Sequence, residues 1–215
     1  MKTIIQIVLW IVCIFLGYLI YQSVNAPIEF NKVRKERFSE VISKLKDIRD
    51  SQEAYKSVNG RYAGNFNSLI QFVDTGNYTI TQRRDSSFMR YDKVYQIELQ
   101  KDTIIVDTLG FVKVKDSLFK NDDRYKSLMD VPGGANGEKF EMKADIIDKG
   151  GYKAPVFEAK VNKDVVLFDQ PKDLLARENA HMSVEEVNGT TLKVGSLTDV
   201  STNGNWPPIY DRKND

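Results

Sequence analysis

Residues that could carry out acid–base or nucleophilic chemistry are scarce in this chain. The only histidine is His181, and the only cysteine is Cys13, which lies inside an apolar run. A Ser-His-Asp or Cys-His arrangement would therefore have to use His181. This histidine falls in a short polar segment, where a surface position is the better interpretation. Paired histidine ligands are excluded, which leaves only oxygen ligands for a metal.

The other polar clusters favour turns rather than sites. Glu185 and Glu186 are adjacent on a predicted strand, so their side chains would point to opposite faces and could not form an acid–base pair. Segments 121–123 and 199–205 contain enough oxygens for calcium but follow no recognised loop spacing. The glycine pair at 133–134 lacks the Lys-Ser/Thr of a phosphate loop. We expect no enzymatic activity, no cofactor and no metal. A hydrolase using only Asp and Glu is the remaining enzymatic alternative.

The apolar run over residues 4–21 predicts a membrane-spanning helix that contacts the lipid bilayer. At about 1.5 Å per residue it reaches about 27 Å, close to the roughly 30 Å of a hydrocarbon core. Trp10 is central, whereas Tyr18 and Tyr21 lie near the far end, where aromatic rings favour the headgroup region. A cleaved signal peptide is the alternative, but the run exceeds the usual apolar core of such peptides. We interpret it as a retained anchor.

Charges near this run give conflicting indications of orientation. The basic residues within 32–37 would place the C-terminal part in the cytoplasm by the positive-inside rule. The short N-terminal tail and the export-signal form of the run favour an exported domain instead. We predict a single-pass inner-membrane protein with its C-terminal domain in the periplasm. The basic patch could contact anionic lipid headgroups, or it could be a solvated helix face.

Composition gives no reason to expect a nucleic-acid partner. The formal net charge is +1, from 31 basic and 30 acidic residues. Acids and bases alternate over most of the chain, as they do on a solvated surface. We therefore expect no binding to nucleic acid.

Residues 23–60 predict a linker followed by a long amphipathic helix. Pro27 is suited to the first helical position, and Asn59 and Gly60 are suited to the end. An apolar stripe recurs every three or four residues between them. Its members are Phe38, Val41, Leu45, Ile48 and Tyr55. We predict that this stripe binds a protein partner; packing against the chain's own domain is the more ordinary use of such a stripe and stays open.

The rest of the chain predicts an α+β fold with a largely antiparallel, β-rich head. Helices are expected at 66–74 and 171–181, and the loop at 129–137 would separate a part over 61–128 from a part over 129–215. Trp206 is expected to fold back onto the head. Strands are predicted at 94–99 and 103–106 around a turn at 100–102, and at 110–114, 139–147, 156–161 and 165–168. A last hairpin joins 184–187 to 190–194, because Asn188-Gly189 suits a type I′ turn.

Part of the N-terminal region resembles the major pseudopilins and type IV pilins. The similar residues are 47–55 (D-I-R-D-S-Q-E-A-Y), 59–62 (N-G-R-Y), Leu69, Ile70 and Val73. Pro27 is similar to the proline that kinks the first helix of many pilins. The resemblance implies that a long helix, beginning as the 1–22 anchor, joins the membrane to a globular head with a β-sheet.

The chain departs from the pilin pattern inside the apolar run. Pilins carry a Gly before the processed N-terminus and a Glu a few residues into the apolar segment. Here the segment follows Met1-Lys2, and the first carboxylate is Glu29. We therefore predict a pilin-like protein that is not a filament subunit.

These observations favour a non-enzymatic structural or assembly subunit of a bacterial cell-envelope machine, such as a secretion, pilus-like or motility apparatus. Its head would bind other proteins of the envelope complex or another copy of itself. The alternative is a ligand-binding or sensory ectodomain on a single-span anchor. The three residues before the span argue against this alternative, because they are too few for an output domain.

Overall fold

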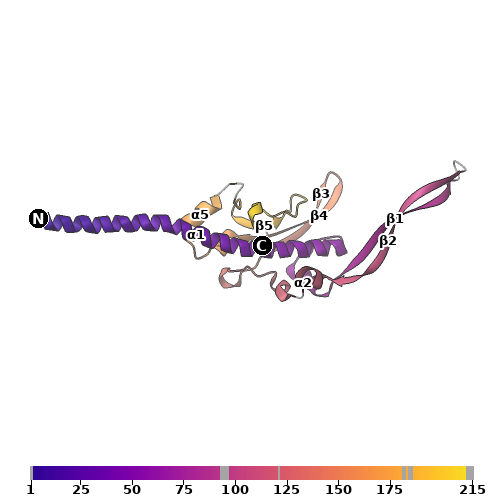
Figure 1. Cartoon of the computed structure of the whole chain (residues 1–215), viewed down its shortest axis with the longest axis horizontal. Coiled ribbons are helices and arrows are strands. Elements are labelled where there is room, and N and C mark those ends of the chain that lie inside the picture. Colours follow the sequence, from indigo (N-terminus) through magenta and orange to yellow (C-terminus); the bar gives the residue numbers. More distant parts are fainter. Residues whose placement is uncertain (1, 93–96, 121, 181–182, 184–185, 212–215) are drawn as a thin grey trace.

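The molecule is elongated: a long helix carries a head along its second half, and a β-ribbon leaves the head at the end opposite the N-terminus (Figure 1). The fold is α+β, as the sequence predicts. The structure is a computed structural model, and it describes residues 2–92, 97–120, 122–180, 183 and 186–211.

Helix α1 spans Lys2–Asn59 without a break, 58 residues in all. The linker predicted at the start of segment 23–60 is wrong, and so is the predicted helix start at Pro27, because this proline lies inside α1. A proline removes one backbone hydrogen bond and crowds the preceding turn. The residues on both sides of Pro27 favour a helix, so α1 continues despite the lost hydrogen bond. At about 1.5 Å per residue, α1 is about 87 Å long.

Helix α1 ends as predicted. Gly60 takes a left-handed conformation with φ of 70°, and its N–H donates to the carbonyl of Lys56 at 2.8 Å. Helix α2 follows over Phe66–Thr75, which confirms the predicted short helix, and the Asn65 side chain caps it by accepting from the N–H of Ser68. Asparagine is among the preferred N-cap residues because its oxygen satisfies one of the free N–H groups of the first turn.

The first hairpin is much longer than the sequence predicts. Strands β1 (Asn77–Asp92) and β2 (Ile97–Lys113) pair antiparallel along their whole length, with one irregularity at Ile80/Thr81. The predicted turn at 100–102 is wrong, because these residues pair with Ser87, Phe88 and Met89 inside the ribbon. Their polarity is tolerated because a ribbon open to solvent does not need alternating apolar residues.

A second sheet lies over α1 with the order β3-β4-β5. Its strands are β3 (Glu141–Lys149), β4 (Tyr152–Asn162) and β5 (Thr191–Gly195), and both pairings are antiparallel. The predicted type I′ turn is wrong: φ is positive at Gly189 but not at Asn188. Strand β5 pairs with the 158–162 part of β4 instead. Within the predicted partner of β5, residues 184 and 185 lie outside the described residues.

Short helices connect the strands. Helix α5 (Lys172–Ala180) confirms the predicted helix at 171–181. The predicted strand at 165–168 is wrong, because its first half lies in helix α4 (Lys163–Val166), which packs Val166 into the core, and its second half is a turn. The remaining elements are α3 (Val114–Phe119), η1 (Asp123–Ser127), η2 (Ala135–Gly137) and η3 (Pro208–Tyr210). Trp206 is buried, as predicted.

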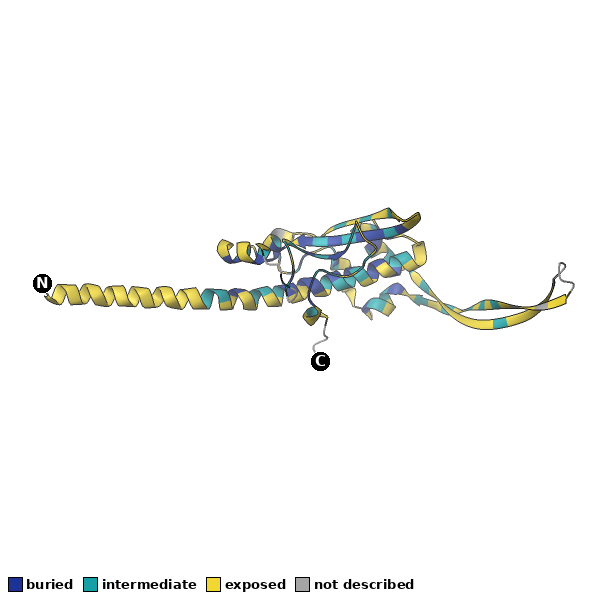
Figure 2. Cartoon of the chain, turned by 90° about the horizontal axis from the view of Figure 1, so that it is seen from above, coloured by how far each residue is buried: buried dark blue, intermediate teal, exposed yellow. Residues whose placement is uncertain are grey.

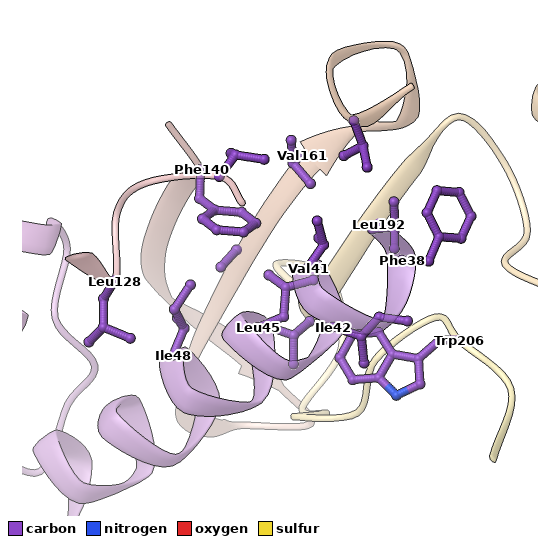
Figure 3. Packing of buried hydrophobic residues seen from close by; sticks show 14 of the residues in the cluster. Phe38, Val41, Ile42, Leu45, Ile48, Leu128, Phe140, Val161, Leu192 and Trp206 are labelled. Carbon is purple, nitrogen blue, oxygen red and sulfur yellow. The ribbon is translucent and has the colours of Figure 1, made fainter. Parts of the chain in front are cut away.

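One core holds the head together, and the α1 stripe is at its centre (Figure 3). Phe38, Val41, Leu45 and Ile48 are at most 1% exposed. The predicted partner-binding role is therefore wrong for these four residues, because their side chains are buried against the chain's own head. Buried residues from both sides of the 129–137 loop join the same core. Tyr55 is half-buried and packs edge-on against Phe72 at 5.0 Å between ring centroids.

Candidate functional site

The first part of α1 is exposed and apolar. Its most apolar 18-residue window has a mean hydropathy of 2.5 and no buried residue, so α1 is long and apolar enough to cross a membrane. The predicted membrane residues lie on this exposed part: Trp10 is 71%, Tyr18 59% and Tyr21 65% exposed. Exposed hydrophobic surface of this extent is typical of a segment that contacts a membrane or another protein. These features are compatible with a single-pass membrane protein that contacts the bilayer through residues 4–21.

The β1–β2 ribbon is the largest exposed feature of the head. Figure 2 shows that it is exposed over most of its length, beyond the place where its base meets the head. At the base, the N–H of Val114 donates to the carbonyl of Gly76 at 3.0 Å, which closes the hairpin onto α2 and α3. A two-stranded hairpin is at best marginally stable alone in water. The ribbon therefore has far less support from the head than the β3-β4-β5 sheet.

One face of the ribbon carries an apolar strip. Alternate residues of a strand share a face, and paired residues on neighbouring strands share it too. The odd-numbered residues of β1 and their β2 partners therefore lie on one side. The exposed apolar residues on this side are Phe111 (71%), Met89 (62%), Ile104 (60%), Tyr91 (57%) and Val106 (53%). We call these five residues the ribbon strip.

Sequence reasoning missed the ribbon strip because it did not recognise β1. No element was predicted over 77–90, although Tyr78, Ile80 and Phe88 are residue types that favour strands. The Thr-Ile-Ile-Val run at 103–106 was recognised as a strand, but its pairing with 83–86 depends on a long-range register. One sequence signal could have revealed the strip. Segment 88–111 contains many apolar residues, yet no helix or strand was predicted to pack over them.

A cluster of four charged residues ties α1 to the C-terminal part of the head. The Lys163 ammonium is fully buried and donates to Glu178 Oε1 at 2.8 Å, to the Glu178 carbonyl at 3.1 Å and to the Val187 carbonyl at 2.7 Å. Arg34 of α1 binds the same Glu178 carboxylate and lies 3.2 Å from Glu186 Oε1. We call Arg34, Lys163, Glu178 and Glu186 the charged cluster. Its charges balance, so it is suited to holding elements together.

The predicted basic patch at 32–37 is largely used for this attachment. Arg37 forms a two-pronged ion pair with Asp169, at 2.6 and 2.8 Å, and donates to the Val166 carbonyl at 2.9 Å. Hydrogen bonds from the Arg37 guanidinium lower the pKa of Asp169 to about 2. Arg34 and Arg37 therefore bind the head's own carboxylates, whereas Lys32 and Lys35 of the same patch are exposed.

The residues first considered for chemistry do not come together. His181, Glu185 and Asn121 lie outside the described residues, and Glu186 belongs to the charged cluster. In the 199–205 segment, Asp199 pairs with Lys149. The Asn205 amide donates to the Thr191 carbonyl at 2.7 Å. Within the described ranges, no three His, Cys, Asp or Glu side chains are grouped to hold a metal ion.

Comparison with known proteins adds no relative. No protein-family model, curated protein or solved structure matches this chain. The resemblance to pilins therefore rests on sequence alone, on Pro27 and the similar residues within 47–62 and 69–73.

Proposed function

We propose that the chain is a non-enzymatic structural or assembly subunit of a bacterial cell-envelope machine, anchored in the inner membrane with its head in the periplasm. In this proposal the β-ribbon, rather than the α1 stripe, binds a protein partner. The observation that carries the proposal is the ribbon strip, five apolar side chains that are each more than half exposed on one face. The resemblance to pilins supports it through the shared arrangement of a membrane helix that continues into a head.

The energetics of the ribbon favour a bound state. Fully burying a large apolar side chain contributes about 1.5–3 kcal/mol. Covering the exposed part of the ribbon strip would thus contribute on the order of 5 kcal/mol before the cost of association. The free edges of β1 and β2 also offer backbone N–H and C=O groups to a partner strand. A protein with an exposed strand edge could both cover the apolar side chains of the ribbon strip and pair with the free backbone groups of β1 or β2.

The arrangement of α1 and the ribbon sets the reach of the molecule. The part of α1 beyond the apolar run, residues 22–59, is about 57 Å long. The 16 residues of β1 add about 53 Å. Figure 1 shows the ribbon continuing away from the N-terminus, so the far end of β1 at Asp92 would stand on the order of 100 Å from the bilayer. Because α1 is one unbroken helix, the distance between the apolar run and the head is fixed.

The experiment places a photocrosslinking amino acid at Ile104 or Phe111 of the full chain in its native cells. Ile146 on β3 is the matched control, because it is 58% exposed but lies outside the ribbon. We expect both ribbon positions to crosslink to one shared envelope protein and the control to give none of that product. Equal crosslinking from all three positions, or from none, would contradict the proposal.

A second variant separates binding from folding. Ile104→Ser combined with Val106→Ser should abolish the crosslink formed from position 111 while leaving the thermal unfolding of the head unchanged, since neither side chain contributes to the core. The orientation is tested with an impermeant thiol reagent on a single cysteine in the 133–134 loop of the Cys13→Ser variant. Protection of that cysteine until the cytoplasm is opened would overturn the periplasmic placement.

A further inference from the structure

A groove lies between α1 and α5 at the point where the apolar run ends. On the α1 side it is lined by Leu19, Gln22, Ser23, Ala26 and Pro27, and on the opposite side by Pro171, Asp173, Leu174 and Arg177. Its volume is about 370 Å³. Leu19 belongs to the apolar run at 4–21, so the groove begins within the segment suited to the bilayer. The rest of its α1 lining follows that run, and its opposite side belongs to the head.

Helix α5 is held firmly beside α1. Leu174 on its inner face is 9% exposed and joins the core, and Glu178 one turn later belongs to the charged cluster with Arg34. These contacts attach both halves of α5, and α1 has no joint between its apolar part and its head part. The groove is therefore at a fixed height relative to the membrane-spanning part of α1.

That height corresponds to the lipid headgroups. Ala26 and Pro27 follow the end of the apolar run at Tyr21 by five and six residues, or about 8–9 Å along α1. The headgroup layer of each leaflet is about 5–8 Å thick, from a hydrocarbon core of roughly 30 Å and a total of roughly 40–45 Å. The groove therefore extends from the acyl boundary at Leu19 to the outer edge of the headgroup layer.

The charges at the groove are complementary to a zwitterionic headgroup. Asp173 and Arg177 are one turn apart on α5, and both are exposed. In the described part of the chain, neither side chain forms an ion pair or a hydrogen bond.

We propose that the α1–α5 groove binds a zwitterionic phospholipid, which seats the head directly on the bilayer. The Arg177 guanidinium binds the lipid phosphate, the Asp173 carboxylate binds the headgroup ammonium, and an acyl chain follows Leu19. This inference rests on the membrane anchoring in the proposed function, but it does not depend on the partner of the ribbon. Binding of the head to the bilayer surface would fix the direction in which the ribbon projects from the membrane.

The first test measures depth in the full chain, reconstituted in phosphatidylethanolamine–phosphatidylglycerol vesicles. A nitroxide is attached to a single cysteine in the Cys13→Ser background, at position 9, 172 or 152. Collision rates with oxygen and with a water-soluble nickel complex report the depth of each label. We expect position 9 to lie in the acyl region, position 172 in the headgroups and position 152, on the far turn of the β3–β4 hairpin, in water.

The outcomes separate this inference from the proposed function. If position 172 is as accessible to nickel as position 152 while position 9 is buried in lipid, the chain is anchored but the head is not seated. If position 9 is also accessible, the anchor itself fails, and the proposed function fails with it.

The second test measures the lipid itself, by native mass spectrometry of the full chain released from detergent with bound phosphatidylethanolamine. The variant Asp173→Asn with Arg177→Gln should retain about tenfold less lipid, as expected for the loss of one or two charge-assisted hydrogen bonds. The matched control is Arg83→Gln with Asp85→Asn on the ribbon, which should retain as much lipid as the unaltered chain. Equal retention by the groove variant and the control would overturn the proposed lipid site.

Discussion

Removing the Glu178 carboxylate should be among the most destabilising single changes in the head. In Glu178→Ala, the ammonium of Lys163 would stay fully buried with only two backbone carbonyls as acceptors. Arg34 would lose the partner that it shares with Lys163. Breaking a buried pair by removing one partner costs about 3–5 kcal/mol, because an uncompensated charge remains. The two remaining carbonyls place the expected cost near the lower end, about 3 kcal/mol.

This cost is measurable by urea unfolding of the full chain in detergent. Trp206 is buried and serves as the fluorescent reporter once Trp10→Phe removes the other tryptophan. A loss of about 3 kcal/mol raises the unfolded fraction about 100-fold. It should lower the urea midpoint by about 1–1.5 M for an m-value of about 2–3 kcal/mol per M.

A double variant tests whether the buried charge causes the loss. Glu178→Leu combined with Lys163→Met replaces the pair with apolar side chains of similar size, which is often neutral or stabilising. We therefore expect the double variant to recover most of the stability that Glu178→Ala loses. The reasoning would be refuted by a cost below about 1 kcal/mol for Glu178→Ala, or by a double variant as unstable as the single one.

Three further changes probe single contacts by the same unfolding assay. Gln52 is fully buried and exchanges two 2.9 Å hydrogen bonds with the backbone of Ala63, so Gln52→Leu should cost about 2–4 kcal/mol by leaving an N–H and a C=O unpaired; a cost below that of an exposed Gln71→Leu control would contradict this. Gly195 has φ of 78°, and an added Cβ would collide with a backbone carbonyl of β4, so Gly195→Ala should cost at least about 1–3 kcal/mol, whereas the open Gly64→Ala should cost little. Arg37 lowers the pKa of Asp169 to about 2, so this pair contributes stability above the unfolded pKa near 3.8 that is lost as the pH falls through about 2. Arg37→Gln should therefore cost at most about 1 kcal/mol at pH 7, because Asp169 is partly exposed, and the difference should vanish below pH 2; a difference that persists there would show that packing, not charge, is responsible.

Local sequence was sufficient where the physics is local. The end of α1 follows from Gly60, because a left-handed residue closes a helix without help from the rest of the chain. Helices α2 and α5 follow from short apolar repeats beside a capping or helix-starting residue. The interruption expected at Pro27 failed because proline marks a helix start only when the residues before it are not already helical.

The partner of each strand could not be read from the sequence. Asn188-Gly189 indicates a local hairpin, yet β5 pairs with β4, whose paired residues lie about 30 positions earlier. A turn signal is worth little compared with burying Leu192 and Val194 against the α1 stripe. The ribbon was missed for a related reason. Strands β1 and β2 pair their backbone hydrogen bonds with each other, so they form without the apolar alternation by which a strand is recognised in a sequence.

The sequence by itself determined that an apolar helix is followed by an amphipathic one, because both properties depend on the types and spacing of neighbouring residues; it did not determine that the two form one helix. Only the tertiary structure decided which surfaces remain free. It buries Phe38, Val41, Leu45 and Ile48 in the head and leaves the ribbon strip exposed. It also brings Lys163 to Glu178 and Arg34 to both α5 and Glu186. Burial and ion pairing depend on residues far apart in the chain, so composition and periodicity cannot assign them.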